Sequence, residues 1–270
     1  MKIAVTGANG YIGRNVVREL IKRNHQVVSI LFPGEDVHPY LEGAEVIRYD
    51  LLKMDNSEIE KEFRDCDALL HLAWQAGFNH QDPCHIQNVI KHYNFITSVY
   101  SSGVKHISVA GTMHEVGYHV GPIDADTPCN PLNPYGIAKN FLRQSLVEHS
   151  TKNGLNLQWL RFYYITGDDK YSSSIFTKIL KASEEGKKKF PLNSGEMLYD
   201  FIDIKELALQ ISTSLESNAV GIYNCCSGKP KSLRTAVVEF IEKNNLDIEP
   251  EFNVFPERPY DSMAVWGVKR

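Results

Sequence analysis

The sequence predicts an α/β chain in which a doubly wound parallel sheet is followed by a smaller C-terminal lobe, and three observations support this class. Gly7, Gly10 and Gly13 follow the short apolar run 3–5, so the chain starts with a strand that turns through glycines into a helix. Short apolar segments then alternate with helical ones up to about residue 165, as in parallel sheets covered by helices. Beyond residue 167 the alternation stops.

The apolar segments are continuous, as expected for strands that are buried on both faces. The expected strands are 3–5, 27–31, 45–49, 68–73, 105–110 and 158–163. The expected helices run from 11 to about 24, over 57–63 and 83–101, and from about 135. Further on, a helix is expected over 175–185 and a basic turn over 186–189. We therefore expect a first domain over 1–165, to which the chain can return later, and a discontinuous lobe formed mainly by 166–270.

Composition excludes several classes of protein. Hydrophobic residues make up 43% of the 270 residues and charged residues 23%, which is ordinary for a globular chain with a full core. The net charge of −4 provides no basic surface for nucleic acid. No apolar run reaches the roughly 20 residues that span a bilayer, and no signal-peptide pattern is present. We expect a cytoplasmic protein with neither membrane nor nucleic acid as partner.

Cysteines and histidines show no metal or disulfide pattern. The five cysteines lie at irregular spacing, which fits neither a disulfide framework nor a four-ligand zinc site, and the ten histidines match no metal motif. We expect reduced thiols and no metal. Cys225 and Cys226 are neighbours in an apparent strand and should therefore face opposite sides of it.

The glycine turn predicts a dinucleotide site. Gly7 can adopt the backbone angles of the turn, Gly10 leaves room for a pyrophosphate, and Gly13 lets the helix approach the strand. The first N–H groups of the helix would then face the phosphates. Glycine turns are common by themselves, so the position between a strand and an amphipathic helix is what makes this one informative. The candidate cofactor-binding residues here are Gly7, Asn9, Gly10, Tyr11, Ile12, Gly13 and Arg14.

Tyr135 and Lys139 form a candidate catalytic pair. They are four residues apart, so a helix places them on one face. The lysine, together with an oxidised nicotinamide, would bring the pKa of the phenol closer to neutrality and make it a usable acid or base. Such pairs also occur by chance on solvated helices. Here the pair follows Pro131 and Pro134 at an expected helix start, after the fifth strand of a nucleotide-binding sheet.

With these motifs in place, the chain resembles the extended short-chain dehydrogenase/reductase family, in its sugar-nucleotide epimerase, dehydratase and 4-ketoreductase branch. The resemblance covers nearly the whole chain and implies a Rossmann-type fold with a substrate-binding lobe. The matching stretches are Thr6–Gly13, Tyr135–Lys139, 71–73, 160–162 with Gly167, 199–208, 221–224 and 258–259.

The resemblance implies a role for each matching residue. Tyr135 would donate or accept the proton, and Lys139 would hold the nicotinamide ribose and lower the tyrosine pKa. Thr112, five residues before Gly117, would be the third catalytic member, with Ser108 as the competing candidate. Asp50 and Leu51 would contact the adenine, and the strand end Leu72, Ala73 and Trp74 would line the cofactor site.

Four departures from the family pattern concern the substrate. The Asp and Glu that dehydratases carry after the threonine are Met113 and His114 here, and a thioether cannot transfer a proton, so dehydration is improbable. His114 is a candidate for contacting substrate or assisting proton transfer, or else a polar pocket wall. Tyr164 and Tyr199 replace an asparagine and an arginine. The remaining candidate substrate residues are Tyr163, for stacking or hydroxyl contacts, and Arg258, for the diphosphate.

Cofactor preference depends on few residues. An acid at the end of the second strand would favour NAD, but Leu31 stands there. Glu35 and Asp36 could fold back towards the ribose, whereas Arg14 could face a 2′-phosphate. The sequence favours NADPH slightly over NADH.

Together these residues predict an NAD(P)-dependent oxidoreductase that reduces the 4-keto group of a nucleotide-activated 4-keto-6-deoxyhexose. The alternative is an NAD-dependent nucleotide-sugar 4-epimerase, which uses the same groups and keeps its cofactor. A non-catalytic dinucleotide-binding protein is a third reading, which the retained Tyr135 and Lys139 disfavour. The resemblance also implies a homodimer.

Overall fold

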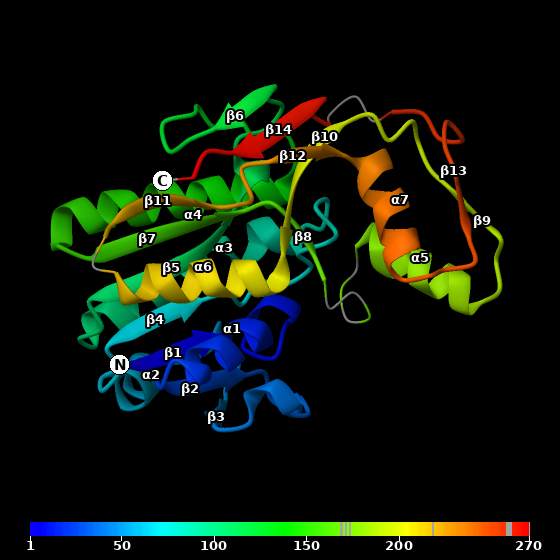
Figure 1. Ribbon diagram of the computed structural model, residues 1–270. Coiled ribbons are helices and arrows are strands. Elements are labelled where there is room, and N and C mark those ends of the chain that lie inside the picture. Colours follow the sequence, from blue (N-terminus) through cyan, green and yellow to red (C-terminus); the bar gives the residue numbers. More distant parts are fainter. Residues whose placement is uncertain (168–169, 171, 173, 218, 258–260, 270) are drawn as a thin grey trace.

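The computed structural model describes residues 1–167, 170, 172, 174–217, 219–257 and 261–269. Its main sheet has seven parallel strands in the order β11-β7-β5-β4-β1-β2-β3 (Figure 1). Their bounds are β1 Lys2–Thr6, β2 Gln26–Leu31, β3 Glu45–Arg48, β4 Ala68–His71, β5 His106–Thr112, β7 Asn156–Phe162 and β11 Gly221–Cys225. The chain moves outward from β1 to β3 on one side and from β4 onward on the other. This reversal between β1 and β4 is where α/β sheets of this kind bind ligands.

Helices cover both faces of the main sheet. Buried side chains of α1 (Tyr11–Lys22) and α6 (Ile204–Glu216) join one core cluster with the sheet. Those of α2 (Asn56–Phe63), α3 (Cys84–Ser101) and α4 (Pro134–Asn153) join the other. The predicted doubly wound α/β class is therefore confirmed, with α6 and β11 returning to the main sheet after residue 165.

The lobe is built from short strands and two helices, and it lies beside the carboxyl ends of the main strands (Figure 1). One sheet has the order β12-β10-β14-β6, with β8 also paired to β10, and β9 pairs with β13. The strand bounds are β6 Gly121–Ile123, β8 Tyr164–Thr166, β9 Lys189–Pro191, β10 Leu198–Asp203, β12 Pro230–Ser232, β13 Glu249–Glu251 and β14 Ala264–Gly267. The helices are α5 Ile175–Glu184 and α7 Leu233–Lys243, and two short 3-10 turns elsewhere are η1 Pro39–Leu41 and η2 Met113–Glu115.

Several boundaries differ by one or more residues from those expected, and three of the differences have a clear structural reason. β4 ends at His71 because the chain turns there to pass under the glycine loop, where a Cβ on Gly7 would lie 2.8 Å from the Ala73 nitrogen. β5 continues to Thr112, whose register partner is Phe162 of β7. Lys189 belongs to β9, paired with Glu249, and not to the expected basic turn.

The cysteines of the described structure are free thiols. Cys225 joins the core cluster under α1 and α6, whereas Cys226 joins the cluster around Met197 and Val265. The two neighbours thus face opposite sides, as expected from strand alternation. Within the described part of the chain, no helix has the length and apolarity of a membrane span.

Candidate active site

The glycine loop at the end of β1 has the geometry of a phosphate-binding turn. Gly7 has a φ of +66°, and a Cβ on Gly13 would lie 2.1 Å from the Gly7 carbonyl oxygen, so both positions require glycine. A Cβ on Gly10 would meet only that same oxygen, at 3.2 Å, which leaves open space above it. Gly10 is also the N-cap of α1 and provides no side-chain cap. An anion can therefore approach the helix N-terminus, as the residues of a dinucleotide site require.

The other loop residues have different surroundings. Tyr11 donates from its hydroxyl to the Gly167 carbonyl, which links the helix start to the loop after β8. Ile12 packs against the core cluster under α1 and α6. The Arg14 guanidinium is nearly covered and lies 5.8 Å from the centre of the Tyr11 ring. Arg14 is therefore enclosed rather than displayed towards solvent.

The acidic segment after β2 folds back onto the glycine loop. The Asn9 amide donates to the Asp36 carbonyl at 2.9 Å, and its oxygen accepts from the His38 nitrogen at 3.0 Å. Glu35 and Asp36 are thereby held beside the loop, one of the two arrangements that the sequence left open.

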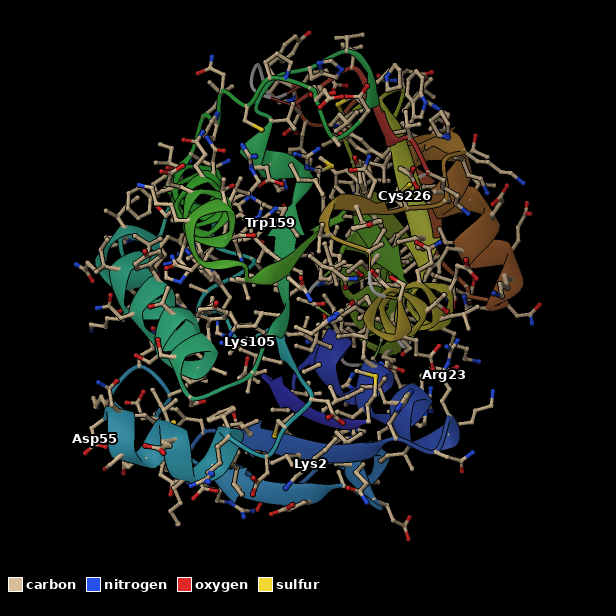
Figure 2. All side chains as sticks on the ribbon, turned by 90° about the vertical axis from the view of Figure 1, so that its left-hand side faces the viewer. Lys2, Arg23, Asp55, Lys105, Trp159 and Cys226 are labelled. Carbon is tan, nitrogen blue, oxygen red and sulfur yellow. The ribbon has the colours of Figure 1, made fainter. Side chains whose placement is uncertain are left out.

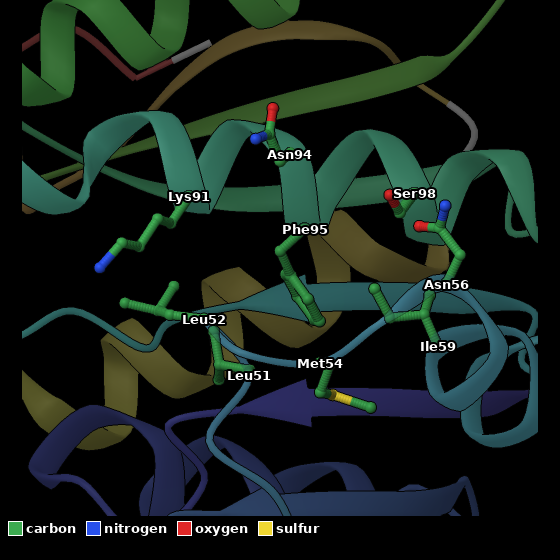
Figure 3. A pocket seen from close by; sticks show the side chains of 9 residues that line it. All are labelled: Leu51, Leu52, Met54, Asn56, Ile59, Lys91, Asn94, Phe95 and Ser98. Atoms are coloured by element: carbon green, nitrogen blue, oxygen red, sulfur yellow. The ribbon is translucent and has the colours of Figure 1, made fainter.

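The predicted adenine contacts lie next to a small hollow. Asp50 forms an ion pair with Lys53 at 2.9 Å. Leu51 and Leu52 line a cavity of about 190 Å³ between this loop and α3, into which Phe95 points (Figure 3). Lining it are Leu51, Leu52, Met54, Asn56, Ile59, Lys91, Asn94, Phe95 and Ser98. Leu72 follows β4, which lies on the opposite side of β1 from β2 and β3. Its backbone nitrogen donates to the Thr6 carbonyl at 3.2 Å.

Thr112, Tyr135 and Lys139 converge at the carboxyl end of β5. Asn133 caps α4 by accepting from the Gly136 nitrogen at 2.8 Å, and Pro134 begins the helix, so the tyrosine lies in its first turn. The Thr112 side chain interacts with the Tyr135 hydroxyl and lowers its pKa. Lys139, which is 2% exposed, donates from Nζ to the Ala110 carbonyl at 2.7 Å. The fold thus brings together all three predicted catalytic groups.

Ser108 has a different partner. It is fully buried within β5 and donates to Gln158 of β7 at 2.7 Å. Of the two hydroxyls that the sequence offered, only the one on Thr112 reaches Tyr135.

Without a nicotinamide, the protein's own groups hold the pKa of the tyrosine above its ordinary value. Burial raises the pKa of Tyr135 to about 12, and the hydrogen bond from Thr112 offsets only part of this effect. Burial also lowers the pKa of Lys139 to about 7, against the attraction of the Glu115 carboxylate. The Lys139 ammonium is directed to the Ala110 carbonyl and to the Trp74 ring, 3.8 Å from the ring centre.

An aromatic wall surrounds Tyr135, and sequence spacing did not reveal it. His80 stacks on the tyrosine ring with centres 4.9 Å apart and planes 11° apart. His114 lies 4.3 Å from His80, and burial lowers the pKa of His114 to about 3. His114 is therefore a neutral wall residue that can form hydrogen bonds but cannot supply a proton near pH 7. His85 and Trp74 complete the wall, 5.1 and 6.3 Å from the ring.

Glu115 is a second residue that the sequence reading missed. Its carboxylate is fully buried, and it accepts from Arg161 Nε at 2.7 Å and from Trp159 Nε1 at 3.0 Å. Trp159 lies deep within the molecule (Figure 2). Arg143 Nε is 3.5 Å away. In the sequence, the only signal for Glu115 was an acidic residue directly after Met113 and His114. A buried carboxylate requires partners such as Arg161 and Trp159, and the sequence does not show which residues these are.

The predicted substrate residues separate into two groups. Tyr163 is packed in the core, and its hydroxyl donates to Asn224 at 3.0 Å. Asn224 in turn donates to the Val268 carbonyl at 3.1 Å, which joins the main sheet to the C-terminal segment. The rings of Tyr164 and Tyr199 are in contact, with centres 4.3 Å apart and planes tilted by 32°, where β8 and β10 meet. Arg258 lies outside the described residues. Among the residues that the structure describes, no cluster could hold a metal ion.

Comparison with known proteins identifies the family. The model of the NAD dependent epimerase/dehydratase family matches residues 3–226. The dTDP-6-deoxy-L-talose 4-dehydrogenase (NAD(+)) of Aggregatibacter actinomycetemcomitans is 63% identical over 270 residues, which is 100% of both chains. The UDP-glucose 4-epimerase of Lactobacillus helveticus is 26% identical over 83% of this chain and 76% of its own.

Solved structures show the same fold. The UDP-N-acetylglucosamine 4-epimerase of Methanobrevibacter ruminantium has a TM-score of 0.87 at 24% identity, covering 99% of this chain and 89% of that one. The UDP-glucose 4-epimerase of Thermus thermophilus, in complex with NAD, has a TM-score of 0.83 at 21% identity over 100% and 91%. The expected class, a nicotinamide-dinucleotide-dependent enzyme of nucleotide sugars, is confirmed. The chain belongs to the NAD dependent epimerase/dehydratase family.

Proposed function

We propose that this chain is a dTDP-6-deoxyhexose 4-dehydrogenase, which in the reverse direction reduces the 4-keto group of a dTDP-4-keto-6-deoxyhexose. The grouping of Thr112, Tyr135 and the buried Lys139 at the carboxyl end of β5 is the observation that carries this proposal. The name of the 63% identical relative supports the thymidine diphosphate, the 6-deoxy sugar and position 4. Met113 supports oxidation or reduction over dehydration, because it cannot exchange the proton that elimination requires.

The chain's own residues have distinct tasks in this reaction. When bound, the nicotinamide supplies or accepts the hydride at sugar C4. Thr112 orients the sugar oxygen towards the Tyr135 hydroxyl. Tyr135 donates its proton to that oxygen during reduction and removes it during oxidation. Lys139, held at the Ala110 carbonyl and the Trp74 ring, would donate from its ammonium to the cofactor ribose. His80 and His114 pack around the Tyr135 ring and keep water from the reacting carbon.

The residues around the glycine loop fit NAD better than NADP, and we propose NAD as the preferred cofactor in place of the NADPH that the sequence slightly favoured. Arg14 is enclosed, so its guanidinium is poorly placed for a 2′-phosphate. The backbone carbonyl of Asp36 accepts from Asn9, so the acidic segment 35–36 lies beside the loop, where its charge would disfavour a 2′-phosphate. The name of the 63% identical relative also specifies NAD(+). Comparing kcat/KM for the two cofactors tests this assignment.

The direct assay incubates purified protein with dTDP-6-deoxy-L-talose and NAD⁺ and follows NADH by absorbance. Stoichiometric NADH formation supports a dehydrogenase. Catalytic conversion to the C4 epimer with tightly retained NAD and no net NADH would instead establish the epimerase. No turnover with a panel of dTDP- and UDP-hexoses in either direction would overturn both.

Two hydroxyl variants separate Thr112 from Ser108. We expect Thr112→Val to lower kcat about a hundredfold, as the loss of one positioned donor does, and Ser108→Ala to change kcat less than threefold. Tyr135→Phe should abolish hydride transfer while leaving NADH affinity within a few fold. Unchanged activity in Tyr135→Phe would favour the non-catalytic reading.

We also propose a homodimer through the outer faces of α3 and α4. Ile86 and Ile90 on α3, and Ile137 and Phe141 on α4, are each 44–49% exposed. Each pair is four residues apart, so each helix has an apolar stripe on one side, and the two helices pack together. Phe141→Glu should convert a dimer into a monomer in sedimentation experiments. A wild-type monomer at micromolar concentration would contradict the proposal.

The cytoplasm is the location that we propose, because the described cysteines are free and Cys225 and Cys226 are buried as thiols. Cell fractionation with an antibody against the chain tests it.

A further inference from the structure

Trp74 lies at the centre of the wall beside the proposed catalytic groups, and its ring contacts a cation. It follows the end of β4, at the sheet edge where the strand order reverses. The Lys139 nitrogen lies 3.8 Å from the centre of the Trp74 ring. The His92 imidazole stacks on the same indole with centres 4.4 Å apart and planes 18° apart.

Hydrogen bonds fix the orientation of the indole. Trp74 Nε1 donates to His85 Nδ1 at 3.0 Å. Because an indole N–H can only donate, His85 Nδ1 is the acceptor, and the proton of the neutral ring is on Nε2. That nitrogen then donates to the Asn79 carbonyl at 2.9 Å. A rotation of the indole would break this chain, so the ring face stays turned to Lys139.

His92 is in turn held by two buried side chains, His71 and Thr6. Its Nδ1 is 3.0 Å from His71 Nε2, and His71 Nδ1 is 2.9 Å from the Thr6 hydroxyl. Thr6 is the last residue of β1, directly before the glycine loop, and its hydroxyl accepts from the Ala73 nitrogen at 3.3 Å. Burial lowers the pKa of both histidines, that of His92 to about 3. Both rings are therefore neutral near pH 7 and add no second positive charge beside Lys139.

We propose that Trp74 is a positioning residue for Lys139, and that its ring face, set by His85 and His92, holds the ammonium at the cofactor site. The inference rests on the proposed function, because that function assigns Lys139 its task. Lys139 has a single hydrogen-bond acceptor within the described protein, the Ala110 carbonyl, so the ring is its second fixed contact. A desolvated cation over an indole is among the stronger contacts of this kind. An apolar filler would serve packing equally well but would leave the ammonium less favoured.

Trp74→Leu removes the ring face and keeps an apolar side chain, and Trp74→Phe keeps a smaller ring and removes the N–H donor. Tyr100→Leu is the matched control, because it deletes a lysine–aromatic contact elsewhere, with Lys105 Nζ 4.0 Å from the ring centre. The other titratable groups facing Lys139 are Tyr135, His71, His92 and Glu115, and all of them stay in place.

The pH profile of kcat, at saturating cofactor and sugar nucleotide, is the readout that a packing role would not move. Without the ring the ammonium is disfavoured, so we expect the basic limb to move down by about one pH unit in Trp74→Leu and by less in Trp74→Phe. At pH values above the shifted limb, kcat of Trp74→Leu should be about tenfold lower than that of the wild type, whereas its KM for the sugar nucleotide should change less than threefold. The Tyr100→Leu profile should superimpose on that of the wild type. A lower kcat with an unshifted or upward-shifted limb would overturn the proposal.

A second measurement keeps the inference apart from the proposed function. In ¹⁵N-lysine-labelled protein, the Lys139 resonance is identified by its absence from Lys139→Arg, and its pKa is read directly. A pKa lower in Trp74→Phe than in wild type supports the inference even if the wild type turns over none of the tested sugars. Equal values in the two proteins overturn it, and this comparison does not require Trp74→Leu to fold.

Discussion

Replacing Glu115 by glutamine tests whether a buried carboxylate anchors the turn that holds the catalytic threonine. The carboxylate is fully buried between Arg161, also fully buried, and Trp159. Its removal leaves the guanidinium inside the protein without a counter-charge, which typically costs about 3–5 kcal/mol. Arg161 keeps a second acceptor, since Nη1 donates to the Asp124 carbonyl at 2.7 Å. We therefore expect the lower end of that range, about 3 kcal/mol.

Urea unfolding at pH 7 measures this loss directly. Thermal unfolding gives a second measure: in a chain of roughly this size each kcal/mol of lost stability lowers Tm by about 2–4 °C, so Tm should fall by about 6–12 °C. The matched control is Glu60→Gln, which breaks an exposed pair with Arg64, 3.9 Å apart, and should change stability by less than about 0.5 kcal/mol. A Glu115→Gln protein within about 1 kcal/mol of wild type would refute the reasoning.

The same substitution should reach catalysis through Thr112. Glu115 ends the η2 turn whose His114 nitrogen donates to the Thr112 hydroxyl at 3.3 Å. A loosened turn displaces that hydroxyl, so kcat should fall roughly tenfold or more while cofactor affinity stays nearly constant, because the glycine loop is untouched. An unchanged kcat would show that the Glu115 carboxylate does not help to position Thr112 for catalysis.

The free energy of unfolding should also fall in acid. Burial lowers the pKa of His92 and of His114 in the folded protein to about 3, whereas the pKa in the unfolded chain is near 6.5. Between pH 6.5 and pH 3 the unfolded chain therefore binds more protons than the folded protein does. Each of the two histidines should then lower the free energy of unfolding by about 2 kcal/mol between pH 7 and pH 5, as measured by urea titration. In His92→Asn the free energy of unfolding should fall less steeply with pH. Equal stability of the wild type at both pH values would contradict this prediction. Gly13→Ala should abolish NADH binding in calorimetry, because its Cβ would lie 2.1 Å from the Gly7 carbonyl oxygen, which belongs to the rigid loop. Gly34→Ala, at a φ of +88° with open space around it, should cost only about 1 kcal/mol and leave binding intact; equal effects of the two changes would show that the contact is unimportant.

Local patterns were sufficient for the elements that depend on local physics. The apolar runs of β1, β2 and β5 and the start of α4 at Pro134 were legible because strand burial and the preference for proline in the first helical turn act over a few residues. The cap by Asn133 appeared only in the structure. Boundaries set by a partner strand were less so, and β5 reaches Thr112 only because Phe162 of β7 pairs with it.

The aromatic wall could not be predicted in the same way. His80, His85 and His92 lie in a loop and on α3, and no spacing rule connects them with Tyr135 or Trp74. Their contacts arise when α3 packs against the main sheet and α4. Equally, Tyr163 follows β7 towards the predicted site, yet its ring turns into the core, because Asn224 of β11 offers its hydroxyl a partner.

The sequence by itself determined the class of fold, the glycine turn and the tyrosine–lysine pair, because each depends on residue types at fixed short separations. The tertiary structure alone decided which hydroxyl meets Tyr135, how burial shifts the pKa values of Tyr135 and Lys139, and that Glu115 lies between Arg161 and Trp159. Burial and electrostatic coupling are properties of groups far apart in the chain, and they acquire values only when the fold brings those groups together.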